Sequence, residues 1–217
     1  MANDTTERRV GRPSRREMLT GVDLATEGVD RFQLIVNTSA KLFSEKGFDR
    51  TSIRDIASAA GLLPGSLYYY FKSKEEIFLE VHSQGMKILS DAAREAIAPH
   101  KDPWCKLEAL AVAHSQVLLD DSGFMFMVAA RFPECIAEQN QILMKQRDEY
   151  EAIIAEVIGE LDLAADIDSD VFRLQFLGAL NWAQTWYRKD RGMAPKDIGK
   201  HLVKILCSAH NGTVREK

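Results

Sequence analysis

Residues 65–74 of the chain, GSLYYYFKSK, bring together side chains that can bind nucleic-acid phosphates and base edges. Hydroxyls and ammonium groups suit phosphate oxygens, and a glycine such as Gly65 lets a helix backbone approach a groove closely. At about 100° per residue, Leu67 and Phe71 fall on one side of a helix and Tyr69 falls roughly opposite. The pattern predicts an apolar inner face and a polar outer face. The alternative is that the tyrosines pack half-buried and the nearby lysines form a solvated rim.

The flanking sequence predicts the short helices that would position this segment. Ser52 and Asp55 form an S-x-x-D capping box, in which each side chain bonds a backbone N–H at a helix start. Gly61 suits a left-handed helix stop, and Pro64 suits the first turn of the next helix. Two short helices joined by a tight glycine-containing turn form the helix-turn-helix layout, whose second helix enters the major groove of DNA.

Longer helices are predicted on both sides of this motif. Over residues 30–46 apolar residues recur at helical spacing, and Gly47 ends the run. Ser73 and Glu76 repeat the capping box, and the helix that they open should continue to about residue 98.

Single residues upstream of the run GSLYYYFKSKEEIF complete a family pattern. They are Phe43, Gly47, Phe48, Thr51, Ser52, Arg54, Ile56, Ala57, Ala60 and Gly61. Together these residues resemble the TetR family of bacterial transcription regulators, densely over about residues 31–80. The resemblance implies that Arg54, Ser66, Tyr68, Tyr69 and Lys74 contact DNA, with the backbone at Gly65 close to it. Thr51, Ser52 and Tyr70 complete the set of candidate DNA-binding residues. Many members of the family have histidine where this chain has Tyr70.

Charge is unevenly distributed along the chain. The formal net charge is −4, yet residues 1–16 contain five arginines and carry +3, while residues 17–86 carry −3. Affinity for DNA must therefore come from locally placed cations and from the arm. The arm, residues 1–29, is expected to be flexible and able to lie in a minor groove; the alternative is a solvated leader with no fixed contact.

Composition argues against several classes of protein. No run of about 18 apolar residues is present to span a membrane, and the polar N-terminus argues against secretion, so a cytoplasmic protein is expected. The three cysteines and five histidines show no disulfide or metal-ligand spacing, so no metal and no cofactor are expected. No phosphate loop or nucleophile motif points to an enzyme.

The rest of the chain, residues 99–217, is helical in its periodicity throughout. The candidate helices are Pro103–Leu119, Phe124–Phe132, Pro133–Leu161, Ser169–Lys189 and Pro195–Ala209. The predicted fold class is all-α, with a three-helix helix-turn-helix domain at residues 30–80 followed by an effector-binding and dimerisation domain at residues 99–217.

A cluster of phenylalanine and methionine at residues 122–132 is the first candidate for an effector pocket. Such clusters can line adaptable apolar pockets, although more often they are core. Arg131 follows this apolar run and would bind an anion, or it would pair with Glu134 or Glu138. An acyl-CoA would supply both an apolar chain and phosphates. The candidate effector residues are Phe124, Met125, Phe126, Met127, Arg131, Phe176 and Trp182.

The apolar face over residues 172–188 is wider than one neighbouring helix can cover. Packing against a second copy, as a four-helix bundle, would explain the excess; the alternative is burial inside one subunit. The candidate dimer residues are Phe172, Ala179, Ala183, Trp186, Ile198, Leu202, Ile205 and Leu206. The sequence around residues 177–195 is also similar to a TetR subgroup that controls fatty-acid or sterol degradation in response to acyl-CoA thioesters.

The function expected from these patterns is a ligand-responsive repressor that binds a palindromic operator in double-stranded DNA as a homodimer. A small apolar or amphipathic effector would release it. One alternative is an activator, or a regulator whose ligand strengthens DNA binding. The other is a helical lipid- or acyl-binding protein that does not bind DNA.

Overall fold

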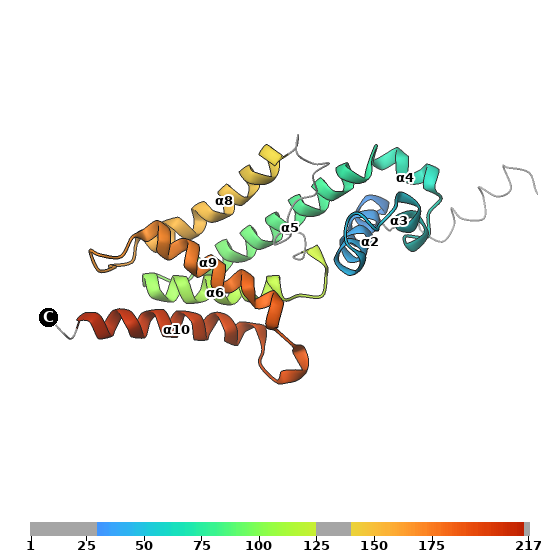
Figure 1. Cartoon of the computed structure of the whole chain (residues 1–217). Coiled ribbons are helices and arrows are strands. Elements are labelled where there is room, and N and C mark those ends of the chain that lie inside the picture. The colour runs from blue at the N-terminus through green and yellow to red at the C-terminus, as the bar shows by residue number, and fades with distance from the viewer. Residues whose placement is uncertain (1–29, 125–139, 215–217) are drawn as a thin grey trace, which may run out of the picture.

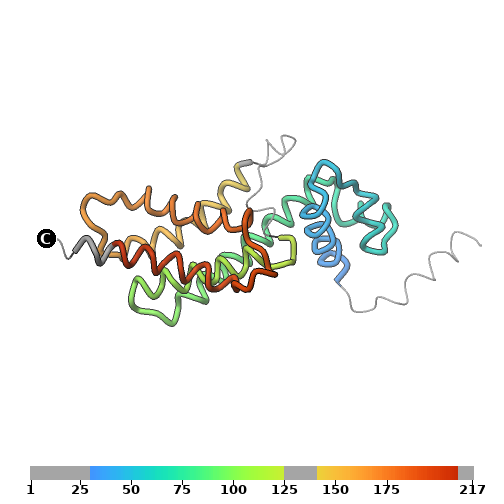
Figure 2. Tube along the Cα trace, turned by 60° about the horizontal axis from the view of Figure 1, so that its bottom comes forward, coloured from blue at the N-terminus to red at the C-terminus, as the bar shows by residue number. Residues whose placement is uncertain are grey.

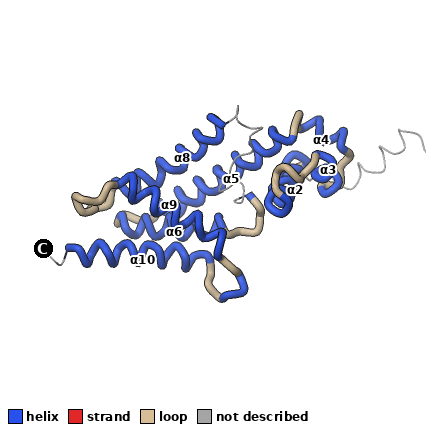
Figure 3. Tube along the Cα trace, in the orientation of Figure 1, coloured by secondary structure: helices blue, strands red, loops and turns tan. Residues whose placement is uncertain are grey.

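The structure, a computed structural model, describes residues 30–124 and 140–214, and the regular elements within these ranges are all helices (Figures 1 and 3). In chain order they are α2 (Arg31–Lys46), α3 (Ile53–Ala59), α4 (Pro64–Tyr70), α5 (Lys74–Ile97), α6 (Pro103–Leu118), α8 (Asn140–Gly159), α9 (Ser169–Trp186), the 3-10 helix η2 (Lys189–Arg191) and α10 (Pro195–Val214). The all-α prediction is confirmed. Helices α2–α4 form a small head, and α5 runs from this head into the longer helical body (Figure 2).

Local capping signals start the helices of the head. Asp30 accepts hydrogen bonds from the backbone N–H groups of Phe32 and Gln33 at the start of α2. The predicted capping box opens α3, where Ser52 accepts from the Asp55 N–H and the Asp55 carboxylate accepts from the Ser52 N–H at 2.9 Å. These bonds satisfy N–H groups that have no partner within their own helix.

Two glycines end these helices, and a cluster of rings holds the head together. Gly47 and Gly61 have φ values of 82° and 69°, which L side chains rarely adopt, so both act as the predicted stops. Phe43 of α2 and Phe48 of the following turn pack on Phe78 of α5, with ring centroids 6.1 and 5.2 Å from it. The head is therefore anchored to the first turns of α5.

The start of α5 differs in one detail from the predicted capping box. Ser73 accepts from the Glu76 N–H at 3.2 Å, as expected. The Glu76 carboxylate, however, accepts from the Lys72 N–H at 2.6 Å. The Glu76 side chain thus binds the N–H of the residue before the N-cap, and Ser73 itself is extended, with φ −149° and ψ 168°.

The body is a bundle in which α5, α6, α8 and α9 enclose a common core and α10 lies along α6 (Figure 1). Gly199 of α10 makes the α6–α10 contact possible: a Cβ there would lie 2.4 Å from the carbonyl oxygen of Ala111. Any larger residue would separate the two helices.

The last helices depart from their predicted bounds. The predicted helix Ser169–Lys189 ends at Trp186, because Tyr187 adopts an extended conformation with φ −61° and ψ 138°. Gly192 then turns the chain with φ 78° before α10. The predicted helix over residues 124–132 lies almost wholly outside the described residues. Within the described ranges, none of the helices is both long and apolar enough to cross a bilayer.

Candidate functional site

The outer face of α4 carries the most exposed aromatic side chains of the head. Tyr69 is 85% exposed and Tyr68 is 55% exposed, whereas Leu67 is completely buried. The predicted orientation of this helix is therefore confirmed. Gly65 is exposed and has open space around the position of a Cβ, so the first turn presents bare backbone to the outside. Ser66 is half-buried beside it. This face combines phenols, a hydroxyl and accessible backbone, the groups that contact bases and phosphates.

Helix α3 and the turn before it add one exposed cation and two engaged hydroxyls. Arg54 is exposed. Ser52 is exposed as well, but its hydroxyl donates to Asp55 at 2.6 Å, and this bond with the backbone bond from Ser52 lowers the pKa of the Asp55 carboxyl. Thr51 is buried, and its hydroxyl donates to the Gly47 carbonyl at 2.8 Å. The Thr51 side chain therefore fixes the turn and does not line the outer surface.

Lys74 has a partner inside the head. Its Nζ donates to the Phe48 carbonyl at 2.9 Å and lies 4.1 Å from the centroid of the Phe48 ring. An ammonium group has three N–H donors, so the contact with Phe48 leaves donors for a phosphate. The side chain is half-buried, and it ties the start of α5 to the turn before α3.

A cavity of about 190 Å³ lies in the body between α5, α6, α8 and α9. Its walls are Met86, Leu89, His114, Arg147, Tyr150, Glu151, Leu177 and Asn181. His114 and Tyr150 are 2% and 3% exposed. The Nδ1 of His114 lies 2.7 Å from the Tyr150 hydroxyl, and its Nε2 lies 3.2 Å from Oδ1 of Asn181. Three helices thus contribute one continuous hydrogen-bonded network to the inside of the body.

Burial keeps this network uncharged near neutral pH. It lowers the pKa of His114 from 6.5 to about 4, with a smaller opposing effect from the Asn181 hydrogen bond. It also raises the pKa of Tyr150. Burial likewise lowers the pKa of Arg147, which Glu151 partly offsets. The cavity therefore presents neutral hydrogen-bonding groups beside the guanidinium of Arg147 and the carboxylate of Glu151.

Comparison with known families follows the division between head and body. Residues 35–81 match the family model described as bacterial regulatory proteins, tetR family, and residues 100–209 match the model of a tetracyclin repressor-like C-terminal domain. The chain belongs to the TetR family. It is accordingly a transcription regulator rather than an enzyme.

Several known proteins are similar to this chain over most of its length. The HTH-type transcriptional repressor KstR2 of Rhodococcus jostii is 30% identical over 190 residues, which span 82% of this chain and 91% of the relative. The TetR-family regulator PfmR of Thermus thermophilus has a TM-score of 0.68 at 28% identity, covering 79% and 95% of the two chains. AibR, solved in complex with isovaleryl coenzyme A and operator DNA, has a TM-score of 0.70 at 20% identity, covering 81% and 97%. The last similarity shows the fold alone.

Of the residues predicted to bind an effector in this TetR-family chain, the three that the structure describes do not line one common cavity. Phe124 is 6% exposed and Phe176 is 2% exposed, so both are core residues, and neither lines the α5–α6–α8–α9 cavity. Trp182 is 65% exposed on α9 and stands with the predicted dimer residues instead. Met125, Phe126, Met127 and Arg131 lie outside the described residues.

The predicted dimer residues divide into an outer and an inner set. Ala179, Trp186 and Ile205 are exposed, with Trp186 at 47% and Ile205 at 66%. Ala183 and Ile198 are buried within the subunit. The remaining members, Phe172, Leu202 and Leu206, are half-buried. Helix α9 also exposes Val171 and Leu174, so its outward side is apolar over most of its length.

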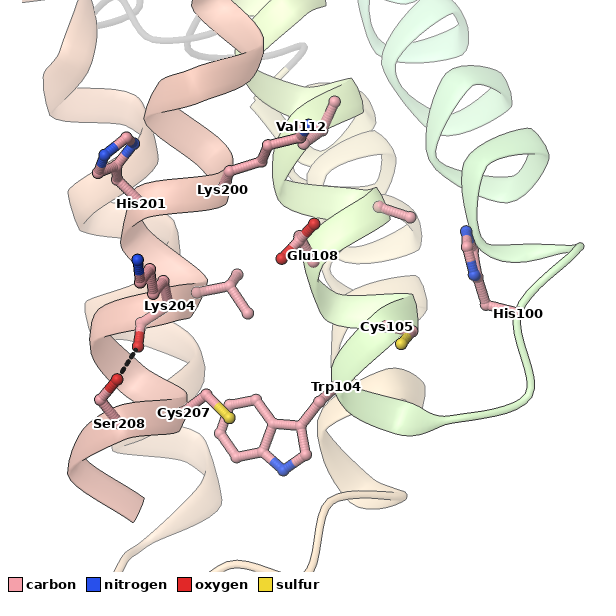
Figure 4. A pocket seen from close by; sticks show the side chains of 12 residues that line it. His100, Trp104, Cys105, Glu108, Val112, Lys200, His201, Lys204, Cys207 and Ser208 are labelled. Atoms are coloured by element: carbon pink, nitrogen blue, oxygen red, sulfur yellow. Dashed lines mark hydrogen bonds between the residues drawn. The ribbon is translucent and has the colours of Figure 1, made fainter. Parts of the chain in front are cut away.

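An open groove of about 690 Å³ runs between α6 and α10 (Figure 4). Trp104 of α6 lies toward Cys207 of α10, and Glu108 and Lys204 line the groove farther along. None of the predicted effector residues in the described ranges lines it. No group of three or more metal-ligating side chains occurs in the part of the chain that the structure describes.

Sequence reasoning did not predict the hydrogen-bonded network of His114, Tyr150 and Asn181. One signal was available: His114 sits on α6 in register with Leu107, Ala111 and Leu118, so a polar residue occupied an apolar stripe. Its partners are 36 and 67 residues away in the chain, and no local pattern connects them.

Proposed function

We propose that this TetR-family chain is a repressor that binds a two-fold symmetric operator as a homodimer and leaves it when a small effector enters the body. The observation that carries the proposal is the outer face of α4. Tyr69 is 85% exposed on a short helix whose other side, at Leu67, is completely buried. The head therefore holds this face rigidly while contributing little of it to its own core, as a recognition helix in a major groove requires.

The outward side of α9 supports a homodimer. Val171, Leu174, Trp182 and Trp186 are all between 47% and 65% exposed, and Ile205 of α10 is 66% exposed. A second copy of the same surface would remove this apolar area from water, which stabilises a dimer by about 25 cal/mol for each Å² of apolar surface buried. Helix-turn-helix dimers read half-sites about 34 Å apart, one turn of duplex, and we expect the two α4 helices of the dimer to match this spacing.

Contacts between head and body support a switch. Gly123 follows α6 with φ 82°, and a Cβ there would lie 2.8 Å from the carbonyl oxygen of Ala40 in α2. Gln33 of α2 donates to Gln84 of α5 at 2.8 Å. A rearrangement of α5 or α6 would therefore move the head. An effector that prefers the rearranged body would weaken DNA binding, and DNA would weaken effector binding by the same free energy.

Acyl-CoA thioesters are the effector class that we favour. A protein of the same fold, AibR, was solved with isovaleryl coenzyme A and operator DNA, and the Rhodococcus relative is a named repressor. Arg131, outside the described residues, stays the candidate for the anionic part of such a ligand. A regulator of this kind acts where the chromosome is, in the cytoplasm.

The test begins with the DNA fragments that the protein selects from its own genome. Sequencing and footprinting should give an inverted repeat, and long-chain acyl-CoA should release the protein from it while the matching free fatty acid does not. Release by neither, alongside release by an uncharged aromatic compound, would remove the acyl-CoA proposal.

Two other results would redirect the functional assignment. Tighter operator binding with acyl-CoA would make the chain a ligand-enhanced regulator. Binding of acyl-CoA without any sequence-selective DNA binding would make it a helical acyl-binding protein.

A further inference from the structure

The hydrogen-bonded network in the body is a costly feature for a core. Apolar side chains of similar size would pack the same space without desolvating an imidazole and a phenol. His114 and Tyr150 are nevertheless almost completely buried, and both border the 190 Å³ cavity. Polar groups that converge on a small cavity indicate a ligand site.

The direction of the hydrogen bonds decides what the network offers to a ligand. His114 is neutral, so one ring nitrogen donates and the other accepts. Its Nε2 faces the amide oxygen of Asn181 and donates to it. Its Nδ1 therefore accepts the proton of the Tyr150 hydroxyl. Tyr150 is left with an oxygen that can only accept, and Asn181 is left with amide N–H groups that can only donate.

The size of the cavity limits how much of a ligand it can hold. At about 30 Å³ for each water-sized group, 190 Å³ accommodates about six non-hydrogen atoms. Met86 and Leu89 of α5 and Leu177 of α9 supply apolar walls, and Asn181 is exposed at the rim. The space suits one end of a ligand and is too small for a long acyl chain.

We infer that this cavity binds a neutral hydroxyl group carried on a compact apolar end of the effector. A hydroxyl donates to the Tyr150 oxygen and accepts from the Asn181 amide, whereas a carbonyl satisfies only Asn181 and a hydrocarbon satisfies neither. The inference rests on the proposed function, because it describes the effector that releases the operator. It narrows that effector from acyl-CoA thioesters in general to those whose acyl end carries a hydroxyl group.

The position of the cavity connects its occupancy to the head. Met86 and Leu89 belong to α5, the helix whose first turns anchor the head through Phe78. A group that fills the cavity displaces these two side chains or fixes them in place. Either change acts on the element that the head and the body share.

Small fragments test the cavity without using DNA. The probes are cyclohexanol, cyclohexanone and fluorocyclohexane, which are matched in size and differ in hydrogen bonding. Their dissociation constants would be measured by NMR titration of the methionine methyl groups of the full-length chain. We expect cyclohexanol to bind about tenfold more tightly than fluorocyclohexane, with cyclohexanone between them. The methyl signal of Met86 should shift, and that of the exposed Met144 should not.

Two substitutions complete the test. Tyr150→Phe should bring the cyclohexanol-to-fluorocyclohexane ratio close to one, and Tyr187→Phe, a tyrosine outside the cavity, should leave it unchanged. If Tyr150→Phe does not fold, the Met86 shift and the relative affinities of the three probes in the wild-type protein still test the inference. Equal binding of the three probes, or no shift at Met86, would overturn the inference. Operator binding is measured separately, so loss of the cavity site with intact operator release would leave the repressor proposal standing.

Discussion

Mild acid should destabilise this protein through His114. The pKa of this histidine is about 4 in the folded chain and 6.5 when exposed, because burial opposes the charged imidazolium. Between these values the unfolded state binds more protons than the folded state, so acid favours unfolding. The stability linked to His114 is therefore fully present above about pH 6.5 and is lost progressively as the pH falls toward 4.

The size of the effect follows from the same two pKa values. Linkage gives a loss of about 2 kcal/mol per subunit between pH 7 and pH 5. Burial also lowers the pKa of His82, which acts in the same direction. A comparison with His114→Gln isolates the His114 contribution, because His82 is present in both proteins.

Urea unfolding of the wild type and of His114→Gln at pH 7, 6 and 5 measures this difference. The protein concentration must be held fixed, since a dimer's stability depends on it. The wild type should lose about 2 kcal/mol more than His114→Gln over this range. His100→Gln, at an exposed position, should follow the wild type. Parallel pH dependence of the wild type and His114→Gln would refute the argument that His114 is buried in its neutral form.

Three further predictions concern the two surfaces. Tyr69→Ala should weaken operator binding about tenfold or more while leaving helix content, dimerisation and Tm unchanged, because the phenol faces outward. Unchanged operator affinity with a lower Tm would instead make Tyr69 a core residue. Lys74→Ala should weaken binding to all duplexes about equally and reduce the salt dependence of the binding constant by about one unit of slope. It should also lower the free energy of unfolding by about 1–2 kcal/mol, because the contacts of Lys74 with Phe48 are lost. Lys72→Ala should spare stability, and a Lys74→Ala loss confined to one DNA sequence would contradict a phosphate contact. Trp182→Glu should raise the dimer dissociation constant at least 100-fold in sedimentation equilibrium, because a charge would be buried between copies. Gln116→Glu, at an exposed position of α6, should leave this constant unchanged, and an unchanged dimer in Trp182→Glu would exclude this face.

Local signals were sufficient to predict the head. The capping box at Ser52 and Asp55 and the stops at Gly47 and Gly61 depend on neighbouring residues only, so the sequence contains the whole of their geometry. The orientation of α4 follows from helical periodicity for the same reason.

Contacts between distant segments were beyond local reasoning. The bond from Lys74 to Phe48 depends on how the turn after α2 packs against α5, which spacing does not reveal. The wide apolar face of α9 showed that two neighbours were needed, but it did not show which residues face inward. Trp182 and Phe176 were therefore grouped in one site, whereas the structure places Trp182 outside and Phe176 in the core.

The most direct test of the account is the ratio between the affinity for the selected operator and the affinity for a scrambled duplex of the same length. It should be measured by fluorescence anisotropy at physiological salt with the dimeric protein. A sequence-reading dimer should give a ratio of about 1,000 or more, and Tyr69→Ala should reduce it. A ratio near one, unchanged by Tyr69→Ala, would contradict the claim that the outer face of α4 recognises an operator.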